Sequence, residues 1–295
     1  MIKLFWNTHN QKKPNSNKSN DKVARDYVWG MYHKDNSDQW IYEILNKIQF
    51  RPIRNEEDLE SGDTLIIIDS SVEKKSELYS RLKLICSKIY LIHLGDESVS
   101  QDLSVIYNNF NFVWRTFCSN RYFKNKKVSC LPLGYKSGIS FKKGEIKRKY
   151  KWAFIGTPHK SSRHDLLFQL SDIEPSFSHK TNRFNEKIIE VNKMNKILSS
   201  TEFIPCPNGF VHPETYRLYE ALECGCIPII ENAYKYYDRL FPKNPFLKID
   251  KWIEIKSVIK EWKDEKINEK RQECGTWWSQ YKKQLQEFMK NKINS

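Results

Sequence analysis

The chain has 295 residues, of which 39% are hydrophobic and 14% aromatic, enough to build two cores of ordinary size or one large core. No apolar stretch approaches the roughly 20 residues that a membrane-spanning helix needs, and the first residues fit neither a secretory signal nor an anchor. The composition therefore predicts a soluble, intracellular protein. A formal net charge of +14 fits an anionic partner, which could be a nucleic acid, a membrane surface or a substrate. A simple lysine-rich bias of the composition explains the charge equally well, and all four explanations stay open.

The cysteines are odd in number, scattered, and mostly inside apolar segments. Cys224 and Cys226, with Cys206 nearby, could suggest a metal site, but their spacing is not that of a zinc knuckle and no histidine pair accompanies them. In a chain of this length a disulfide framework is not expected. We therefore predict free, buried thiols in a reducing compartment, and no metal site.

Short apolar runs alternate with helical stretches along the chain, which is typical of an α/β protein with largely parallel sheets. Residues 10–21 are polar and aperiodic and are expected to form a loop. Helices are expected at 38–48 and 76–86. The strands expected in the first half are Ile2–Trp6, Thr64–Ile68, Lys88–His93, Phe112–Thr116 and Val128–Leu131.

After a basic segment at 142–151 the same pattern starts again. Strands are expected at 151–157, 176–179, 203–206 and 227–231, with an edge strand at 244–249. Helices are expected at 162–170, 185–198 and 213–224, and from residue 252 to the end. The sequence thus predicts two α/β domains, 1–145 and 146–295, with a ligand cleft at the carboxyl ends of their strands.

The segment Ser199–Glu231 is predicted to form a strand, a turn, a helix, a tight turn and a second strand. Pro213 is expected in the first helical turn, where its missing N–H has no cost and the free helix amides suit a phosphate. Glu214, Arg217 and Glu220 recur every three residues and would share one helix face. Spacing alone also fits a solvent-exposed face with ion pairs, so both interpretations stay open at this point.

The same segment resembles the exostosin-like glycosyltransferases, in which a strand ending in Pro-x-Gly precedes Arg-x-x-Glu-Ala-x-x-x-Gly-x-Ile-Pro-Val. The matching elements are Pro207-Asn208-Gly209, Arg217-Leu218-Tyr219-Glu220-Ala221 and Gly225-Cys226-Ile227-Pro228-Ile229. Together with Leu131–Tyr135 and FIGTPHKSSR, the chain is also similar to the ribitol xylosyltransferase-like relatives of that group. The resemblance implies a GT-B fold, with two Rossmann-like domains facing across a cleft, the nucleotide sugar bound mainly to the second, and a C-terminal helical segment.

Carried over by position, Arg217 would hold the donor diphosphate, Glu220 the ribose, and Thr215 with the helix amides would add hydrogen-bond donors. A second cluster follows the strand at 151–157, where Gly156 lets the backbone approach a ligand and Lys160 and Arg163 can neutralise phosphates. No metal is expected, since basic side chains and the helix dipole serve the leaving group in this fold and the chain has no Asp-x-Asp. The donor-side residues predicted in full are Gly156, Thr157, Lys160, Arg163, Pro207, Gly209, Glu214, Thr215, Arg217 and Glu220.

An inverting transfer needs a base near the acceptor hydroxyl, usually from a loop of the first domain. Asp96 is the first candidate and Glu97 the second, because both follow the strand Lys88–His93 at its carboxyl end. The residues predicted on the acceptor side are His33, Arg115 and Tyr135.

The chain is thus predicted to be a transferase of polysaccharide biosynthesis that moves a hexosyl or pentosyl group from a nucleoside diphosphate, first of all UDP. The acceptor is a glycan, a phosphorylated polyol or a lipid-linked saccharide. Inversion is expected from the resemblance, no cofactor is expected, and the location is cytoplasmic with peripheral contact at an anionic inner membrane face. The alternatives are a basic nucleic-acid-binding protein, disfavoured because no basic stripe with interleaved aromatics or nucleic-acid motif occurs, and an inactive GT-B scaffold that binds a glycan.

Overall fold

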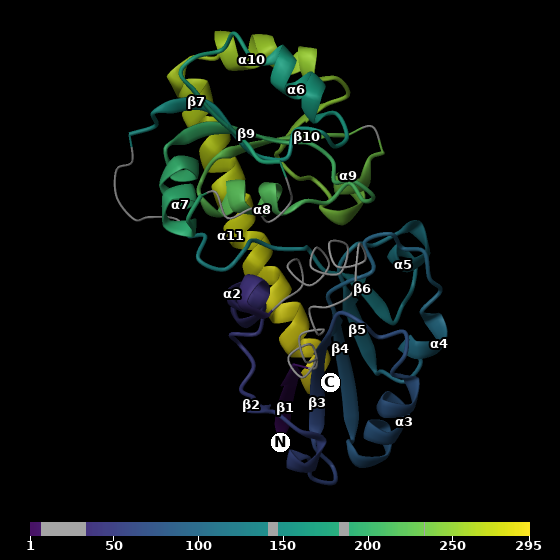
Figure 1. Cartoon of the computed structure of the whole chain (residues 1–295). Helices are drawn as coiled ribbons and strands as arrows, with labels where there is room; N and C mark the ends of the chain where they lie inside the picture. Colours follow the sequence, from purple (N-terminus) through teal and green to yellow (C-terminus); the bar gives the residue numbers. More distant parts are fainter. Residues whose placement is uncertain (7–33, 141–146, 183–188, 233) are drawn as a thin grey trace. The chain divides into compact units, whose positions relative to one another are not determined.

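The structure is a computed structural model that describes residues 1–6, 34–140, 147–182, 189–232 and 234–295 (Figure 1). The loop predicted at 10–21 and the candidate residue His33 lie outside these ranges. Contacts divide the chain into two units, Met1–Leu133 with Leu285–Ser295, and Gly134–Gln284. The division therefore falls at Gly134 rather than at the predicted residue 145, and the last residues group with the first unit.

The first unit is built on a six-stranded sheet in the order β2-β1-β3-β4-β5-β6, with every neighbouring pair parallel. The five predicted strands are all present, and β2 was not predicted because it is a three-residue edge strand that contains Pro52. The connecting helices are α2 (Lys34–Ile44), α3 (Ser76–Ile85), α4 (Ser104–Tyr107) and α5 (Asn120–Phe123), with a 3-10 turn at Glu56–Asp58. The strands are β1 (Ile2–Trp6), β2 (Arg51–Ile53), β3 (Thr64–Asp69), β4 (Lys88–His93), β5 (Phe112–Arg115) and β6 (Val128–Cys130).

The central strands of this sheet are apolar on both faces. Leu65, Ile66, Ile67 and Ile68 of β3 are all fully buried. A parallel sheet covered by helices on both faces requires such continuous apolar runs. Because of this unbroken apolar pattern, the bounds of β3 and β4 could be predicted closely from the sequence.

The second unit is built on a five-stranded parallel sheet in the order β11-β10-β9-β7-β8. Its strands are β7 (Tyr150–Gly156), β8 (Ser176–Lys180), β9 (Thr201–Cys206), β10 (Ile227–Glu231) and β11 (Leu247–Ile249), the last at the edge as predicted. The helices are α6 (Arg163–Gln169), α7 (Val191–Ser199), α8 (Tyr216–Glu223), α9 (Tyr236–Leu240), α10 (Ile255–Glu261) and α11 (Asp264–Asn294), with a 3-10 turn at Trp252–Glu254. Two parallel sheets with helices confirm the predicted α/β class.

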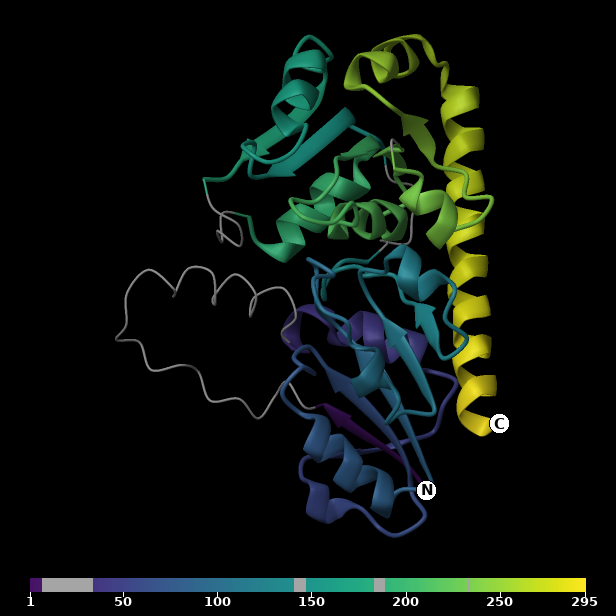
Figure 2. The ribbon, with the colours of Figure 1, turned by 90° about the vertical axis from the view of Figure 1, so that its right-hand side faces the viewer.

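The predicted C-terminal helical segment is confirmed by α11, a continuous 31-residue helix drawn in yellow in Figure 2. Within the second unit its aromatic side chains form a stack, with the Trp277 and Tyr281 ring centroids 5.3 Å apart and the Trp278 and Tyr281 centroids 5.9 Å apart. Phe241 packs edge-on against Tyr281 at 5.0 Å. This aromatic packing anchors α11 to the end of α9.

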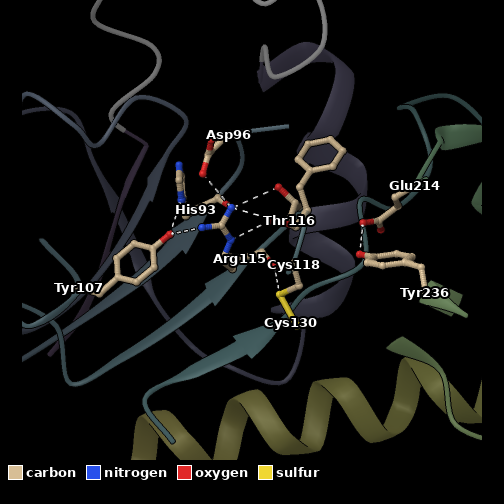
Figure 3. Close-up of a disulfide and its surroundings, with 10 residues drawn as sticks. His93, Asp96, Tyr107, Arg115, Thr116, Cys118, Cys130, Glu214 and Tyr236 are labelled. Atoms are coloured by element: carbon tan, nitrogen blue, oxygen red, sulfur yellow. Dashed lines mark hydrogen bonds and ion pairs between the residues drawn. A yellow bond between two sulfur atoms is a disulfide. The ribbon is translucent and has the colours of Figure 1, made fainter. Parts of the chain in front are cut away.

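The prediction that all cysteines are free is wrong for one pair. Cys118 and Cys130 form a disulfide with their Cα atoms 5.6 Å apart (Figure 3). Because β5 and β6 are neighbours in the sheet, the residues at and just beyond their carboxyl ends meet, which the sequence separation does not reveal. The cysteines that remain free are buried, as predicted: Cys86, Cys206, Cys224, Cys226 and Cys274.

The described ranges contain no group of histidine, cysteine and acidic side chains that could hold a metal ion. Nor does any helix within them have the length and apolar character required to cross a membrane.

Candidate functional site

The loop of residues 207–215 joins β9 to α8 at the carboxyl edge of the second sheet, where open parallel sheets bind ligands. Gly209 shapes this loop: a Cβ atom there would lie 2.3 Å from the carbonyl oxygen of His212. The Gly209 N–H donates to the Pro213 carbonyl at 3.3 Å. The Pro-x-Gly element thus folds back on itself before the helix begins.

The helix begins later than the sequence predicted. Thr215 is the N-cap and α8 starts at Tyr216, so the prediction that Pro213 opens the helix is wrong. The physical reason is that the Pro213 carbonyl accepts hydrogen bonds from the Gly209 N–H and, at 2.9 Å, from the Tyr237 hydroxyl. Glu214 therefore precedes the helix, and only Arg217 and Glu220 share the predicted helical face.

Arg217 brings the two predicted donor-side clusters together. Its Nη2 donates to the Ile155 carbonyl at 2.8 Å, and its guanidinium lies 4.9 Å from the centroid of the Phe154 ring in β7. Gly156 has φ +144°, and a Cβ on it would lie 2.3 Å from Nη2 of Arg217. Glycine at the end of β7 is thus required both by the backbone conformation and by the position of Arg217.

Glu220, one turn further along α8, is 4% exposed. Burial raises the pKa of this carboxyl, while the positive charges of Lys136 and Arg217 act in the opposite direction. Lys136 also lies with its Nζ 5.4 Å from the Tyr216 ring centroid, at the first residue of α8. No sequence pattern had singled out Lys136, because nothing in the spacing connects it with a helix some 80 residues away (136 against 216–223).

Three buried polar atoms at this end of α8 have no hydrogen-bond partner within the described parts of the chain: Asn208 Oδ1, Thr215 Oγ1 and Arg217 Nε. The Thr215 side chain does not cap its own helix. A buried polar group without a partner costs about 1–3 kcal/mol, so native structures tolerate few of them. Grouped at a helix N-terminus, a hydroxyl and a guanidinium nitrogen suit an anionic ligand with oxygen atoms.

The other residues predicted on the donor side, in and just after the loop that follows β7, mainly contact other residues of the second unit. Arg163 is 6% exposed, and its Nη1 donates to the Thr157 carbonyl at 3.1 Å. The Thr157 hydroxyl lies 3.2 Å from that of Thr181. Lys160 is half-buried, with its Nζ 5.2 Å from the Phe210 ring centroid, so it is the cation of this loop that lies beside the 207–215 loop.

Glu214 has a different environment from the one expected of a ligand-binding residue. It is 2% exposed, and its carboxylate accepts a hydrogen bond from the hydroxyl of Tyr219 in α8. It also accepts one from the hydroxyl of Tyr236 in α9 at 2.9 Å (Figure 3). The structure thus places Glu214 in the interior of the second unit.

In the first unit, Asp96 and Arg115 form a buried ion pair at the carboxyl ends of β4 and β5 (Figure 3). Arg115 Nη2 lies 3.1 Å from Asp96, Nη1 donates to the Tyr107 hydroxyl at 3.1 Å, and Arg115 is fully buried. That hydroxyl lies 2.7 Å from Nδ1 of His93, whose pKa burial holds well below its ordinary value. Arg115 therefore holds Asp96 in place, and the neighbouring Glu97 is half-buried.

Tyr135, predicted on the acceptor side, groups by its contacts with the second unit. It is 2% exposed, and the Nζ of Lys282 in α11 lies 5.9 Å from its ring centroid. Its surroundings are thus those of a packing residue.

Residues 136–295, more than half of the chain, match the family described as the RXYLT1 C-terminal domain. Among solved structures, the chain is similar to an α1,3-fucosyltransferase, with 12% identity and a TM-score of 0.52 over 99% of this chain and 90% of that one. It is also similar to Anabaena Alr3699/HepE in complex with UDP, with 10% identity and a TM-score of 0.54 over 99% of each chain. No curated protein matches it. At identities this low, the similarity shows the fold alone, and this structural similarity confirms the predicted GT-B fold.

Proposed function

The chain belongs to the exostosin-like glycosyltransferase family described by the RXYLT1 C-terminal domain, and on that premise we propose that its donor is a nucleoside diphosphate sugar bound at the N-terminus of α8. It is a glycosyltransferase by family and fold. The observation that carries the proposal is the grouping of Arg217, Glu220 and the unpartnered polar atoms at one end of α8.

Each group has a role that matches its chemistry. Arg217 Nε and Thr215 Oγ1 can donate to diphosphate oxygens, and the adjoining helix N-terminus adds a partial positive charge. The buried carboxylate of Glu220 can accept hydrogen bonds from both ribose hydroxyls. Lys136 adds positive charge beside Glu220. UDP is the proposed nucleotide, supported by the UDP and UDP-glucose complexes of Anabaena Alr3699/HepE.

We propose a single displacement with inversion. The acceptor hydroxyl attacks the anomeric carbon, the bond from that carbon to the diphosphate oxygen breaks, and a carboxylate takes the hydroxyl proton. Asp96 and Glu97 stay the proposed bases, with Asp96 held by Arg115. The leaving diphosphate is stabilised by Arg217 and the helix N-terminus, so no metal is required in this proposal.

The acceptor and the compartment are proposed from the composition of the chain. The basic composition favours an acceptor that carries phosphate or lies near an anionic membrane: a glycan, a phosphorylated polyol or a lipid-linked saccharide. A cytoplasmic location, peripheral at the inner membrane face, stays a prediction. The Cys118–Cys130 disulfide weighs against a strongly reducing compartment.

The test is binding of UDP and of a panel of nucleotide sugars in EDTA, measured by thermal shift and calorimetry. We expect UDP to bind the wild type and to bind Glu220→Gln much more weakly. Glu223→Gln is the matched control, because Glu223 lies at the other end of α8, where its carboxylate accepts hydrogen bonds from Trp278 and Lys282. A response to oligonucleotides alone, or equal UDP binding by all three proteins, contradicts the proposal.

A further inference from the structure

The 207–215 loop gains little stability from burial at its tip. Phe210 and Val211 are large apolar residues, yet they are 67% and 56% exposed. A surface loop with few buried apolar contacts is among the first parts of a protein to open locally. Its conformation must therefore depend on contacts made elsewhere in the loop.

Polar contacts hold the loop at both ends. The Asn208 N–H donates to Glu231 at 2.7 Å. The Ser161 hydroxyl donates to the Gly209 carbonyl at 2.8 Å, and a further group of contacts lies at the helix-proximal end.

The Glu214 carboxylate accepts hydrogen bonds from the hydroxyls of Tyr219 and Tyr236, and we call these three residues the tyrosine clamp. The His212 ring packs edge-on against Tyr236 with 4.6 Å between centroids, and its Nδ1 accepts the Glu214 N–H at 3.2 Å.

We propose that Glu214 is a positioning residue for the donor, not a ligand of it. By joining Tyr219 of α8 to Tyr236 of α9 through one buried carboxylate, it fixes the loop that carries Asn208 and ends at Thr215. The inference rests on the proposed function, since it concerns how the same donor site is held.

The covalent path from the clamp to the site is short. Thr215 follows Glu214 directly and is the N-cap of α8, so a displaced Glu214 moves the Thr215 hydroxyl and the first helix amides. Arg217 is held separately, by the Ile155 carbonyl at 2.8 Å. Loss of the clamp should therefore weaken part of the diphosphate contact and leave Arg217 in place.

A positioning role and a purely structural role differ in what they change. Contacts to the diphosphate are already made when UDP is bound, so their loss lowers the affinity of the folded protein for UDP. A residue that serves only the fold lowers the melting temperature without changing the affinity of the folded protein for UDP.

The experiment compares Glu214→Gln and Tyr236→Phe with the wild type, using Glu223→Gln as the control. Tyr236→Phe keeps the aromatic ring and removes only the hydroxyl that donates to Glu214, so the fold is retained. We expect each clamp variant to bind UDP about tenfold more weakly, as for the loss of one hydrogen bond to a charged group. Amide exchange of the peptide covering 207–215 should become faster in both, and both quantities should stay near wild type in Glu223→Gln.

The possible results separate two failures. If the wild type binds UDP and both clamp variants bind it within twofold of the wild type, the positioning role is refuted and the donor site stands. If Glu223→Gln weakens UDP binding as much as the clamp variants do, the effect is general destabilisation and the proposal is again refuted. If the wild type does not bind UDP, the proposed function fails and the positioning role fails with it.

Discussion

Replacing Gly156 with alanine tests how the proposed donor site is built. The backbone at Gly156 has φ +144°, which L side chains rarely adopt, and the new Cβ would lie 2.3 Å from Arg217 Nη2. Arg217 would have to leave its hydrogen bond with the Ile155 carbonyl, now 2.8 Å long, because ordinary contact distances begin at 3.4 Å. The substitution thus acts on Arg217 without changing any charge.

Two contributions to the free energy of unfolding follow from this geometry. Backbone strain at a position that favours glycine costs about 1–3 kcal/mol. Loss of a hydrogen bond from a charged donor costs about 1.5–3 kcal/mol, less whatever the flexible arginine recovers with a new partner. We expect a loss of about 2–5 kcal/mol in stability, and a UDP affinity lowered roughly 10- to 100-fold by the displaced guanidinium.

The assay is urea unfolding together with UDP calorimetry, and Gly62→Ala is the matched control. Gly62 also has a positive φ, +88°, but its added Cβ meets nothing within 4 Å, so it introduces strain without a clash. We expect Gly62→Ala to lose stability and keep UDP binding. In a double-mutant cycle, Gly156→Ala should have little further effect on UDP binding once Arg217 is alanine. Wild-type UDP binding by Gly156→Ala, or fully additive losses of affinity in the cycle, would refute the reasoning.

Three further predictions concern charge, covalent linkage and pH. Arg115→Met removes the cation from the 4% exposed Asp96 side chain and should cost about 3–5 kcal/mol in urea unfolding, with partial recovery when Asp96→Asn is added. Cys118 and Cys130 are 12 residues apart in the sequence, and replacing both with serine should lower the free energy of unfolding by about 2–4 kcal/mol. A reductant should lower the stability of the wild type by a similar amount. If neither change has an effect, the disulfide does not form. Burial raises the Glu220 pKa above its ordinary 4.5, so between pH 4.5 and the raised pKa the folded state binds more protons than the unfolded one. Wild-type stability should fall as pH rises through that window, and Glu220→Gln should lack this slope; identical pH profiles would contradict the assignment.

The long apolar strands could be predicted from the sequence because their burial on both faces leaves an unbroken pattern. Lys88–His93 and Ile227–Glu231 were located to the residue. Arg51–Ile53 and Asn120–Phe123 were not predicted, since segments of three or four residues carry no clear periodicity. Their positions depend on pairing with strands that are distant in the sequence.

The candidate site was predictable where the chain itself sets the geometry. Arg217 and Glu220 share a helix face because of their spacing alone. Lys136 could not be predicted from the sequence, because its contact with α8 joins segments that are distant in the chain and is set by the fold. Glu214 was misplaced for a related reason: Pro213 suits a first helical turn, but its carbonyl is engaged by Tyr237 from another helix.

The end of α8 combines features that each reduce the stability of the folded chain. A buried Glu220 carboxylate has its pKa raised by burial, and the charges of Lys136 and Arg217 only partly offset that cost. Unpartnered polar atoms of Asn208 and Thr215 add to it. Such costs concentrated at one place are expected of a site organised in advance for a polar ligand. The proposed ribose diphosphate would satisfy both kinds of group at once, because its hydroxyls would donate hydrogen bonds to Glu220 and its anionic oxygens would accept them from Arg217 and Thr215.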